Sequence, residues 1–251
     1  MRAGRCAARA LALVPPAVTH AAAAALALLS LLNPPAAGAA GAQAAGSPAR
    51  ERSADAPHAN GGIWISVGLL AGPARMDARL ADYQWDASPR AAWGAQTMAG
   101  RGRIAAGLRL WRTRATQRLG LSGIPDPTIH ATSVECLGQA LLATTWDTRI
   151  VVTGSVGRLH LGYDPARITI PSPGPGGPVE VRLASVDEWI AGGGVGFRRP
   201  LAPRWTVGLD VERRLFGLDV AHRSGAVIVN ARESFGDWSA HLELARILTR
   251  H

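Results

Sequence analysis

Three residues in one short stretch, His130, Ser133 and Glu135, have the types that nucleophilic catalysis needs. A histidine base, a serine nucleophile and an orienting carboxylate hydrolyse acyl bonds when their side chains converge. Side chains of an extended chain alternate between two faces, so His130 and Ser133, three positions apart, would point in opposite directions. We therefore keep an acyl hydrolase built on these residues as an alternative, and predict that the chain is not an enzyme.

Residues that could bind a metal ion are spread widely along the chain. The candidates are His160, His222 and His241 with Glu243, and no pair of them has the close spacing of a zinc site. The stretch GRGRIA at 100–105 has the form of a dinucleotide-binding turn, but a run with arginines at alternate positions follows it instead of a helix. We therefore expect neither a metal nor a cofactor.

The segments that must position these side chains have the pattern of strands from Gly62 onward. Apolar residues recur there at every second position, whereas no long stretch keeps a clean helical period. Eight such runs occur, at 63–69, 90–99, 103–110, 133–142, 149–163, 179–198, 204–216 and 238–248. The fifth run changes phase near Gly157, which predicts a β-bulge there. The fold class is therefore all-β.

The connections between these runs alternate in length. The second and third, fourth and fifth, and sixth and seventh runs are joined by the short segments GRG, DT and RPLAP. The other connections are roughly 15 to 20 residues long, well above the usual hairpin loop. Short turns at one end and long loops at the other are typical of an eight-stranded antiparallel up-and-down transmembrane β-barrel.

Which face of the strands points inward distinguishes a water-soluble barrel from a membrane barrel. In a water-soluble barrel the apolar side chains face inward, whereas in a membrane barrel they face lipid and the polar side chains face the interior. We predict the membrane barrel, because lipid-facing strands must satisfy their backbone by closing into a ring, and eight strands give a small ring that side chains can fill. A soluble periplasmic barrel that binds an apolar ligand is the alternative with the opposite sense.

Polar residues with inward parity form a predicted network in a plugged interior, because an unpaired buried charge costs several kcal/mol. They are Arg103, Arg109, Glu135, Asp210, Glu212, His241 and Glu243. Tryptophans near the strand ends are predicted to lie at the two membrane interfaces. They are Trp93, Trp146, Trp205 and Trp238.

The first sixty residues have the composition of an export signal and a linker. Arginines without acidic residues precede the apolar run AAAAALALLSLL at 21–32, which is shorter than the roughly 20 residues of a membrane-spanning helix. Small residues in the A-x-A style follow, so we predict a signal peptide at 1–42, cleaved after Ala42 with Ala39 as the alternative, and a disordered leader at 43–61. The barrel then occupies 62–251. Cys6 leaves with the signal peptide, so Cys136 stands alone and no disulfide is expected.

The charge balance is basic, with a formal net charge of +9 and no lysine. The arginines are scattered through alternating runs and never form a basic cluster with interleaved aromatic residues, so we expect no nucleic-acid partner. Outer-membrane lipids and lipopolysaccharide phosphates are the expected partners of exposed arginine on an exported protein.

The stretch GGGVGFRRPLAPRWTVGLDVERRLF, at 192–216, has the strand, tight turn and strand of a known group. Over residues 62–251 the chain resembles the small eight-stranded bacterial outer-membrane barrels of the OmpA-like type. The resemblance implies a monomer in the Gram-negative outer membrane, inserted by the barrel assembly machinery, with a structural or surface-interaction role in the envelope. Lipid A deacylases are also eight-stranded barrels, which makes a membrane-embedded lipid A acyl hydrolase the specific form of the enzymatic alternative.

Overall fold

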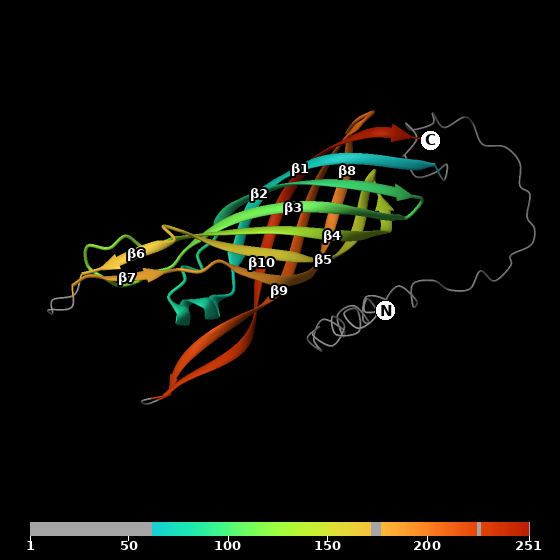
Figure 1. The fold of residues 1–251 in the computed structure, drawn as a ribbon. Helices are drawn as coiled ribbons and strands as arrows, with labels where there is room; N and C mark the ends of the chain where they lie inside the picture. The colour runs from blue at the N-terminus through green and yellow to red at the C-terminus, as the bar shows by residue number, and fades with distance from the viewer. Residues whose placement is uncertain (1–61, 172–176, 225–226, 251) are drawn as a thin grey trace, which may run out of the picture. The chain divides into compact units, whose positions relative to one another are not determined.

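The computed structural model describes residues 62–171, 177–224 and 227–250. Eight antiparallel strands close into a ring in which each strand pairs with the next one along the chain and the last pairs with the first (Figure 1). They are β1 (Ile63–Met76), β2 (Arg90–Arg101), β3 (Ile104–Thr116), β4 (Thr128–Thr145), β5 (Thr148–Asp164), β8 (Val186–Ala202), β9 (Trp205–Ser224) and β10 (Val227–Arg250). The predicted eight-stranded up-and-down barrel is confirmed. The predicted signal peptide and leader lie outside the described residues.

The connections differ at the two ends of the barrel. At one end, the turn end, β2 and β3, β4 and β5, and β8 and β9 are joined by only two residues each, at 102–103, 146–147 and 203–204. Trp146 and Asp147 both have positive φ, of 50° and 61°, as two-residue hairpin turns require. At the other end, the loop end, the connections 77–89 and 165–185 carry further structure (Figure 1).

That further structure comprises a short helix and a separate hairpin. The 3₁₀ helix η2 (Ala78–Tyr83) lies between β1 and β2. Strands β6 (Arg167–Ile170) and β7 (Val179–Arg182) pair with each other and form a two-stranded sheet apart from the barrel. The predicted run at 179–198 is therefore two strands, because the chain leaves the hairpin after Arg182 and enters the barrel only at Val186.

Most of the long connection predicted between the runs 204–216 and 238–248 is instead a continuation of the two strands. β9 and β10 remain paired as far as Ser224 and Val227, so their hairpin extends beyond the other strands (Figure 1). Leu218 and Val220 have the inward parity of Asp210 and Glu212, and at the loop end this parity carries apolar side chains that pack against the buried cluster, which explains why the ladder persists.

The bulge predicted near Gly157 is wrong. β5 pairs with β8 from Arg149 to Leu161 without a shift in register. Leu159 and Leu161 simply face inward, where they are buried in an apolar cluster. The interior changes from polar to apolar along the strand, and this change imitates a change of phase in the sequence.

The side chains of the barrel are arranged with apolar groups outside and charged groups inside. On β9, Leu209 is 44% exposed, whereas Asp210 is 2% and Glu212 4% exposed. The same sense holds on β10, where Leu242 is exposed and Glu243 buried. No helix in the described part of the chain is long and apolar enough to cross a membrane.

The interior is layered along the barrel axis. At the loop end an apolar cluster joins η2 to the inner faces of several strands, and it includes Leu80, Trp85, Ile129, Leu161, Phe216 and Phe235. Near the turn end a smaller cluster contains Met98, Ala105 and Leu137. The charged side chains lie between these clusters and form the candidate site.

Candidate functional site: an ionic layer across the barrel

Arg109 of β3 connects opposite sides of the barrel. Its guanidinium lies 2.8 Å from Glu135 on the neighbouring strand β4 and 2.7 Å from Glu212 on β9. β3 and β9 are separated by β2, β1 and β10 in the ring, so the contact with Glu212 crosses the interior. The Arg109 side chain is 1% exposed, and burial of this kind requires the two carboxylates as partners.

Arg214 of β9 makes a second crossing. It donates two hydrogen bonds to Asp237 on β10, at 2.9 and 2.7 Å, in the bidentate geometry that suits a guanidinium and a carboxylate. A third bond, of 3.1 Å, reaches Glu135 on β4. The guanidinium also lies 5.4 Å from the ring centre of Trp111, so it is enclosed by an aromatic face as well as by acids.

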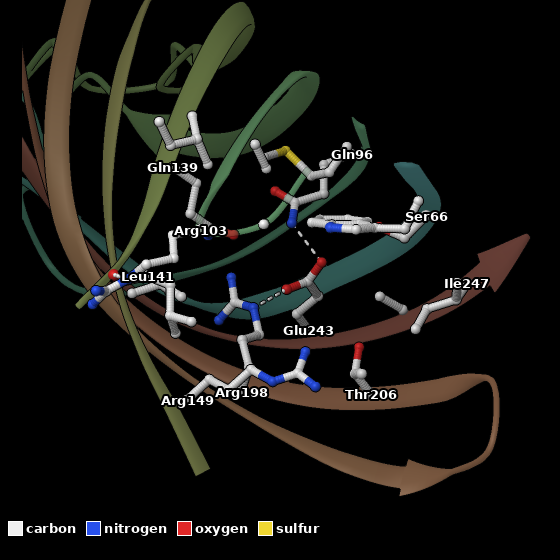
Figure 2. A pocket seen from close by; sticks show the side chains of 17 residues that line it. Ser66, Gln96, Arg103, Gln139, Leu141, Arg149, Arg198, Thr206, Glu243 and Ile247 are labelled. Carbon is white, nitrogen blue, oxygen red and sulfur yellow. Dashed lines mark hydrogen bonds and ion pairs between the residues drawn. The ribbon is translucent and has the colours of Figure 1, made fainter. Parts of the chain in front are cut away.

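A second group of charges lies nearer the turn end. Arg198 of β8 binds Asp210 at 2.9 Å and Glu243 at 2.7 Å. Figure 2 shows Glu243 between Arg198 and the amide of Gln96, which donates to the carboxylate. His241 completes the group, with Nε2 3.4 Å from Asp210 Oδ2. The residues of both groups together are called the ionic layer: Gln96, Arg109, Glu135, Arg198, Asp210, Glu212, Arg214, Asp237, His241 and Glu243.

Glycines give the ionic layer its space. A Cβ at Gly194 would meet the Glu212 side chain and the Val211 carbonyl, and one at Gly196 would meet Asp210. β8 therefore presents bare backbone where the carboxylates of β9 fill the interior.

Asp210, Glu212 and His241 bring three potential metal ligands within 4.8 Å of one another. The residue types suit a divalent cation. Both carboxylates already bind a guanidinium, Asp210 that of Arg198 and Glu212 that of Arg109, so the positive charge needed at this point is supplied by the protein. We therefore assign these residues to the ionic layer.

Most of the predicted polar residues meet in the ionic layer, and Arg103 does not. Arg109, Glu135, Asp210, Glu212, His241 and Glu243 all lie within it. Arg103 is exposed in the turn before β3 and donates hydrogen bonds to the carbonyls of Leu141 and Leu142, at 3.2 and 2.7 Å. The alternation that turns Arg109 inward does not extend to Arg103, because a turn residue lies outside the strand pleat.

The sequence interpretation missed Arg214, Asp237 and Gln96, and left Arg198 out of the network. Arg214 has the parity of Asp210 and Glu212, and Asp237 has that of His241. Following the inward positions two residues further along each strand would have included both in the network. Gln96 lies in the run 90–99, where alanine and threonine obscure the alternation of apolar and polar residues.

The possible catalytic residues do not form a triad. Ser133 and Glu135 are buried inside the barrel, where Ser133 Oγ donates to Glu135 at 2.6 Å. His130 has the opposite parity and pairs across the sheet with Arg114. Of the histidines considered for a metal, His160 binds Asp187 on the outer face at 2.9 Å, and the His222 side chain lies outside the described residues.

The four predicted interfacial tryptophans are all exposed on the outside. Trp93 and Trp238 lie toward the loop end, whereas Trp146 and Trp205 lie at or next to the turns. Each pair marks one end of the apolar outer surface.

Two cavities open on opposite sides of the ionic layer. The one at the loop end has a volume of about 470 Å³ and is lined by Leu80, Trp85, Leu161, Tyr163, Leu218 and Val220, among others. The one at the turn end, drawn in Figure 2, has about 70 Å³ and reaches Gln96, Arg198 and Glu243. They share no lining residue.

Comparison with known proteins gives a likeness only at the level of the fold. No family model and no curated protein sequence matches the chain. The chain resembles solved outer-membrane β-barrels.

Three of these structures illustrate the likeness. The N-terminal β-barrel domain of OprF from Pseudomonas aeruginosa is 13% identical, with 73% of this chain and 97% of that chain covered and a TM-score of 0.36. Ail of Yersinia pestis is 12% identical, with 74% and 98% covered and a TM-score of 0.40. Outer membrane protein W of E. coli is 12% identical, with 73% and 97% covered and a TM-score of 0.40.

Proposed function

We propose that this chain is an exported β-barrel of the bacterial outer membrane, with a closed interior and a structural or surface-interaction role in the cell envelope. The observation that carries the proposal is the ionic layer, in which Arg109 and Arg214 join strands on opposite sides of the barrel. Charged side chains bridge the middle of an interior in this way when the apolar side chains that alternate with them face the outer surface.

The outer surface supports membrane embedding. Along β9 the outward residues between Arg204 and Arg213 are apolar, and along β10 those between Trp238 and Arg246 are apolar. Nine residues of a strand tilted by about 40° rise roughly 23 Å, which matches the height of a lipid-facing band. A soluble barrel that binds an apolar ligand would need the reverse arrangement, so the exposed aliphatic side chains count against that alternative.

The ionic layer supports a closed interior. The contacts of Arg109 with Glu212 and of Arg214 with Glu135 cross the space through which a solute would pass. The apolar cluster and η2 lie on the loop side of these contacts.

Outer-membrane lipids, lipopolysaccharide and the barrel assembly machinery are the partners we propose for a monomer of this kind. The hydrolase alternative is not favoured, because His130 lies away from Ser133 and Glu135.

Refolding of residues 43–251 into phospholipid vesicles tests the proposal. We expect unboiled protein to migrate differently from boiled protein in a detergent gel, since a closed barrel resists unfolding by detergent. We expect no stable conductance steps in planar bilayers. Steady channels from the unmodified chain would contradict the closed interior, and a protein that stays soluble and monomeric without lipid would contradict the membrane assignment.

A further inference from the structure

Five arginines face outward on the barrel strands near the loop end, next to the apolar band. They are Arg75, Arg112, Arg114, Arg158 and Arg213, called here the outer arginine belt. None of the five forms an ion pair with a carboxylate in the part of the chain that the structure describes. The buried arginines of the ionic layer, in contrast, each bind two acids. The outer arginine belt therefore has positive charge that the protein itself does not neutralise.

Tryptophans alternate with these arginines across the sheet. Arg75 of β1 pairs with Trp238 of β10, and Trp238 pairs with Arg213 of β9, so the three side chains form one outward row. The guanidinium of Arg213 lies 5.5 Å from the ring centre of Trp238. Arg158 lies 5.1 Å from the ring centre of Trp189 in the same way. Stacking of this kind holds a guanidinium flat at the surface, with its N–H groups directed away from the ring.

Acidic residues are absent from the surface around this row. The outward positions of residues 63–75, 205–217 and 236–248 contain no aspartate or glutamate. A guanidinium beside hydrocarbon is costly unless water or an anion reaches it. Arginine binds phosphate through two parallel hydrogen bonds, and the outermost polar groups of a membrane are phosphates.

We propose that the row of Arg75, Trp238 and Arg213 binds the phosphate groups of a phosphorylated glycolipid, lipopolysaccharide, in the leaflet at the loop end. The two arginines lie two strand spacings apart, roughly 10 Å, so one lipid with two phosphates contacts both guanidiniums. The choice of lipid rests on the proposed function. In an outer-membrane barrel the short turns lie on the periplasmic side, which places the loop end in the outer leaflet. Trp238 separates the two cations and lies where the acyl chains meet the headgroup.

Native mass spectrometry of the mature chain with purified diphosphoryl lipid A tests the site. We expect the unmodified barrel to retain one lipid A, and the double variant Arg75→Gln/Arg213→Gln to retain at least about tenfold less, since two bidentate contacts are lost. Lipid A from which both phosphates have been removed should be retained as weakly by the unmodified chain as by the variant. Equal retention of the two lipid A forms would overturn the proposal.

The same two strands offer a matched control at the turn end. Arg246 of β10 lies 5.7 Å from the ring centre of Trp205 of β9, so this pair repeats the geometry of Arg213 and Trp238 in the opposite leaflet. Arg246→Gln should leave lipid A retention within about twofold of the unmodified chain. A loss as large as that of the double variant would show that any outward arginine contributes equally to lipid A retention, and would overturn the assignment of the site to this row. Retention of phosphatidylglycerol as strong as that of lipid A would overturn the assignment to a glycolipid.

Failure of this inference can be told apart from failure of the proposed function. Each sample is also tested for heat-modifiable migration after refolding into vesicles. A barrel that inserts but retains no lipid A overturns only the phosphate site. A chain that fails to insert overturns the membrane assignment as well.

Discussion

Arg214 is the residue whose loss the barrel interior should tolerate least. Its side chain is 2% exposed and binds Asp237 and Glu135, so Arg214→Leu would leave Asp237 buried without a cation. Removing one partner of a buried pair costs about 3–5 kcal/mol, and we expect that decrease in the free energy of unfolding in vesicles, measured by urea titration. Arg214→Leu combined with Asp237→Leu should cost less than the sum of the single changes.

The adjacent residue provides the control for this prediction. Arg213 is outward, makes no ion pair with any residue that the structure describes, and stacks on Trp238, so Arg213→Leu in phosphatidylcholine vesicles should change the free energy of unfolding by less than about 1 kcal/mol. Equal losses from the two leucine variants would contradict the assignment of Arg214 to the interior.

Two glycines of β5 test the packing of the interior at the same scale. A Cβ at Gly157 would fall on the carbonyl oxygen of Val134 on β4, whereas a Cβ at Gly154 would meet nothing within 4 Å. We expect Gly157→Ala to lower the free energy of unfolding by about 2 kcal/mol or more, because the backbone of β4 or β5 has to move to make room for the new methyl group. Gly154→Ala should be neutral or slightly stabilising, as alanine restricts the unfolded chain. A larger loss for Gly154→Ala than for Gly157→Ala in urea titrations would show that the inward and outward faces of β5 are misassigned.

At the scale of the element, the Asp77 carboxylate is a polar anchor of η2, in addition to the apolar contacts of Leu80. Asp77 caps the helix, accepts from the backbone N–H of Gly236 at 3.2 Å, and binds Arg79, which also donates to the Ser234 carbonyl at 2.6 Å. We expect Asp77→Ala to raise the rate of tryptic cleavage after Arg79 about fivefold, since loss of a cap costs about 1 kcal/mol. Asp126→Ala is the matched control, because Asp126 accepts from the N–H of Leu119 in the next loop, and it should expose the bond after Arg118 instead.

The anchor of η2 also depends on pH. The hydrogen bond from Arg79 lowers the pKa of Asp77 below its ordinary value. A carboxyl whose pKa is lowered by folding stabilises the fold above its ordinary pKa, and this contribution disappears as the pH falls through the lowered value. Amide hydrogen exchange of η2 should therefore be constant near neutral pH and lose protection only in acid, after correction for the intrinsic rate. Loss of protection between pH 6 and 8 would contradict the role of Asp77.

The period-two pattern predicted the strands and their faces well, and predicted their ends poorly. Side-chain direction in a barrel follows from strict alternation, so Leu209 and Asp210 could be assigned to opposite faces from the sequence. Strand length depends on what lies beyond the barrel. The hairpin of β9 and β10 continues because Leu218 packs against the cluster at the loop end, a contact between distant segments that local spacing does not encode.

The sequence predicted many of the residues of the ionic layer, but not which of them form ion pairs with each other. Inward parity selected Arg109, Glu135 and Glu212 from the sequence. Their pairing depends on which strands face each other across the ring, and that follows from its closure and shear. Arg109 and Glu212 are 103 positions apart in the chain, and no local pattern relates them.

At the scale of the whole molecule, the interior combines two kinds of packing. Apolar side chains fill the loop end beneath η2, and the ionic layer fills the middle, so apolar packing and paired charges each stabilise a different level of the barrel. The barrel has paired strands throughout its ring, and its backbone therefore needs no partner from outside. The proposed membrane location adds one requirement, an apolar medium around the outward apolar side chains of the strands, called here the outer band.

A charge scan of the outer band tests this requirement for the molecule as a whole. Leu209 lies in the middle of the outward apolar stretch of β9, whereas Leu215 lies beyond Arg213, toward the loop end. In a bilayer, Leu209→Arg should lower the free energy of unfolding by about 2–4 kcal/mol, and Leu215→Arg by about 0–1 kcal/mol, because the cost of arginine falls steeply away from the midplane. In water, both changes would be substitutions of partly exposed leucine and would cost similar, small amounts. Equal effects at the two positions would therefore mean that lipid does not surround the barrel, whereas a steep difference locates the midplane near Leu209.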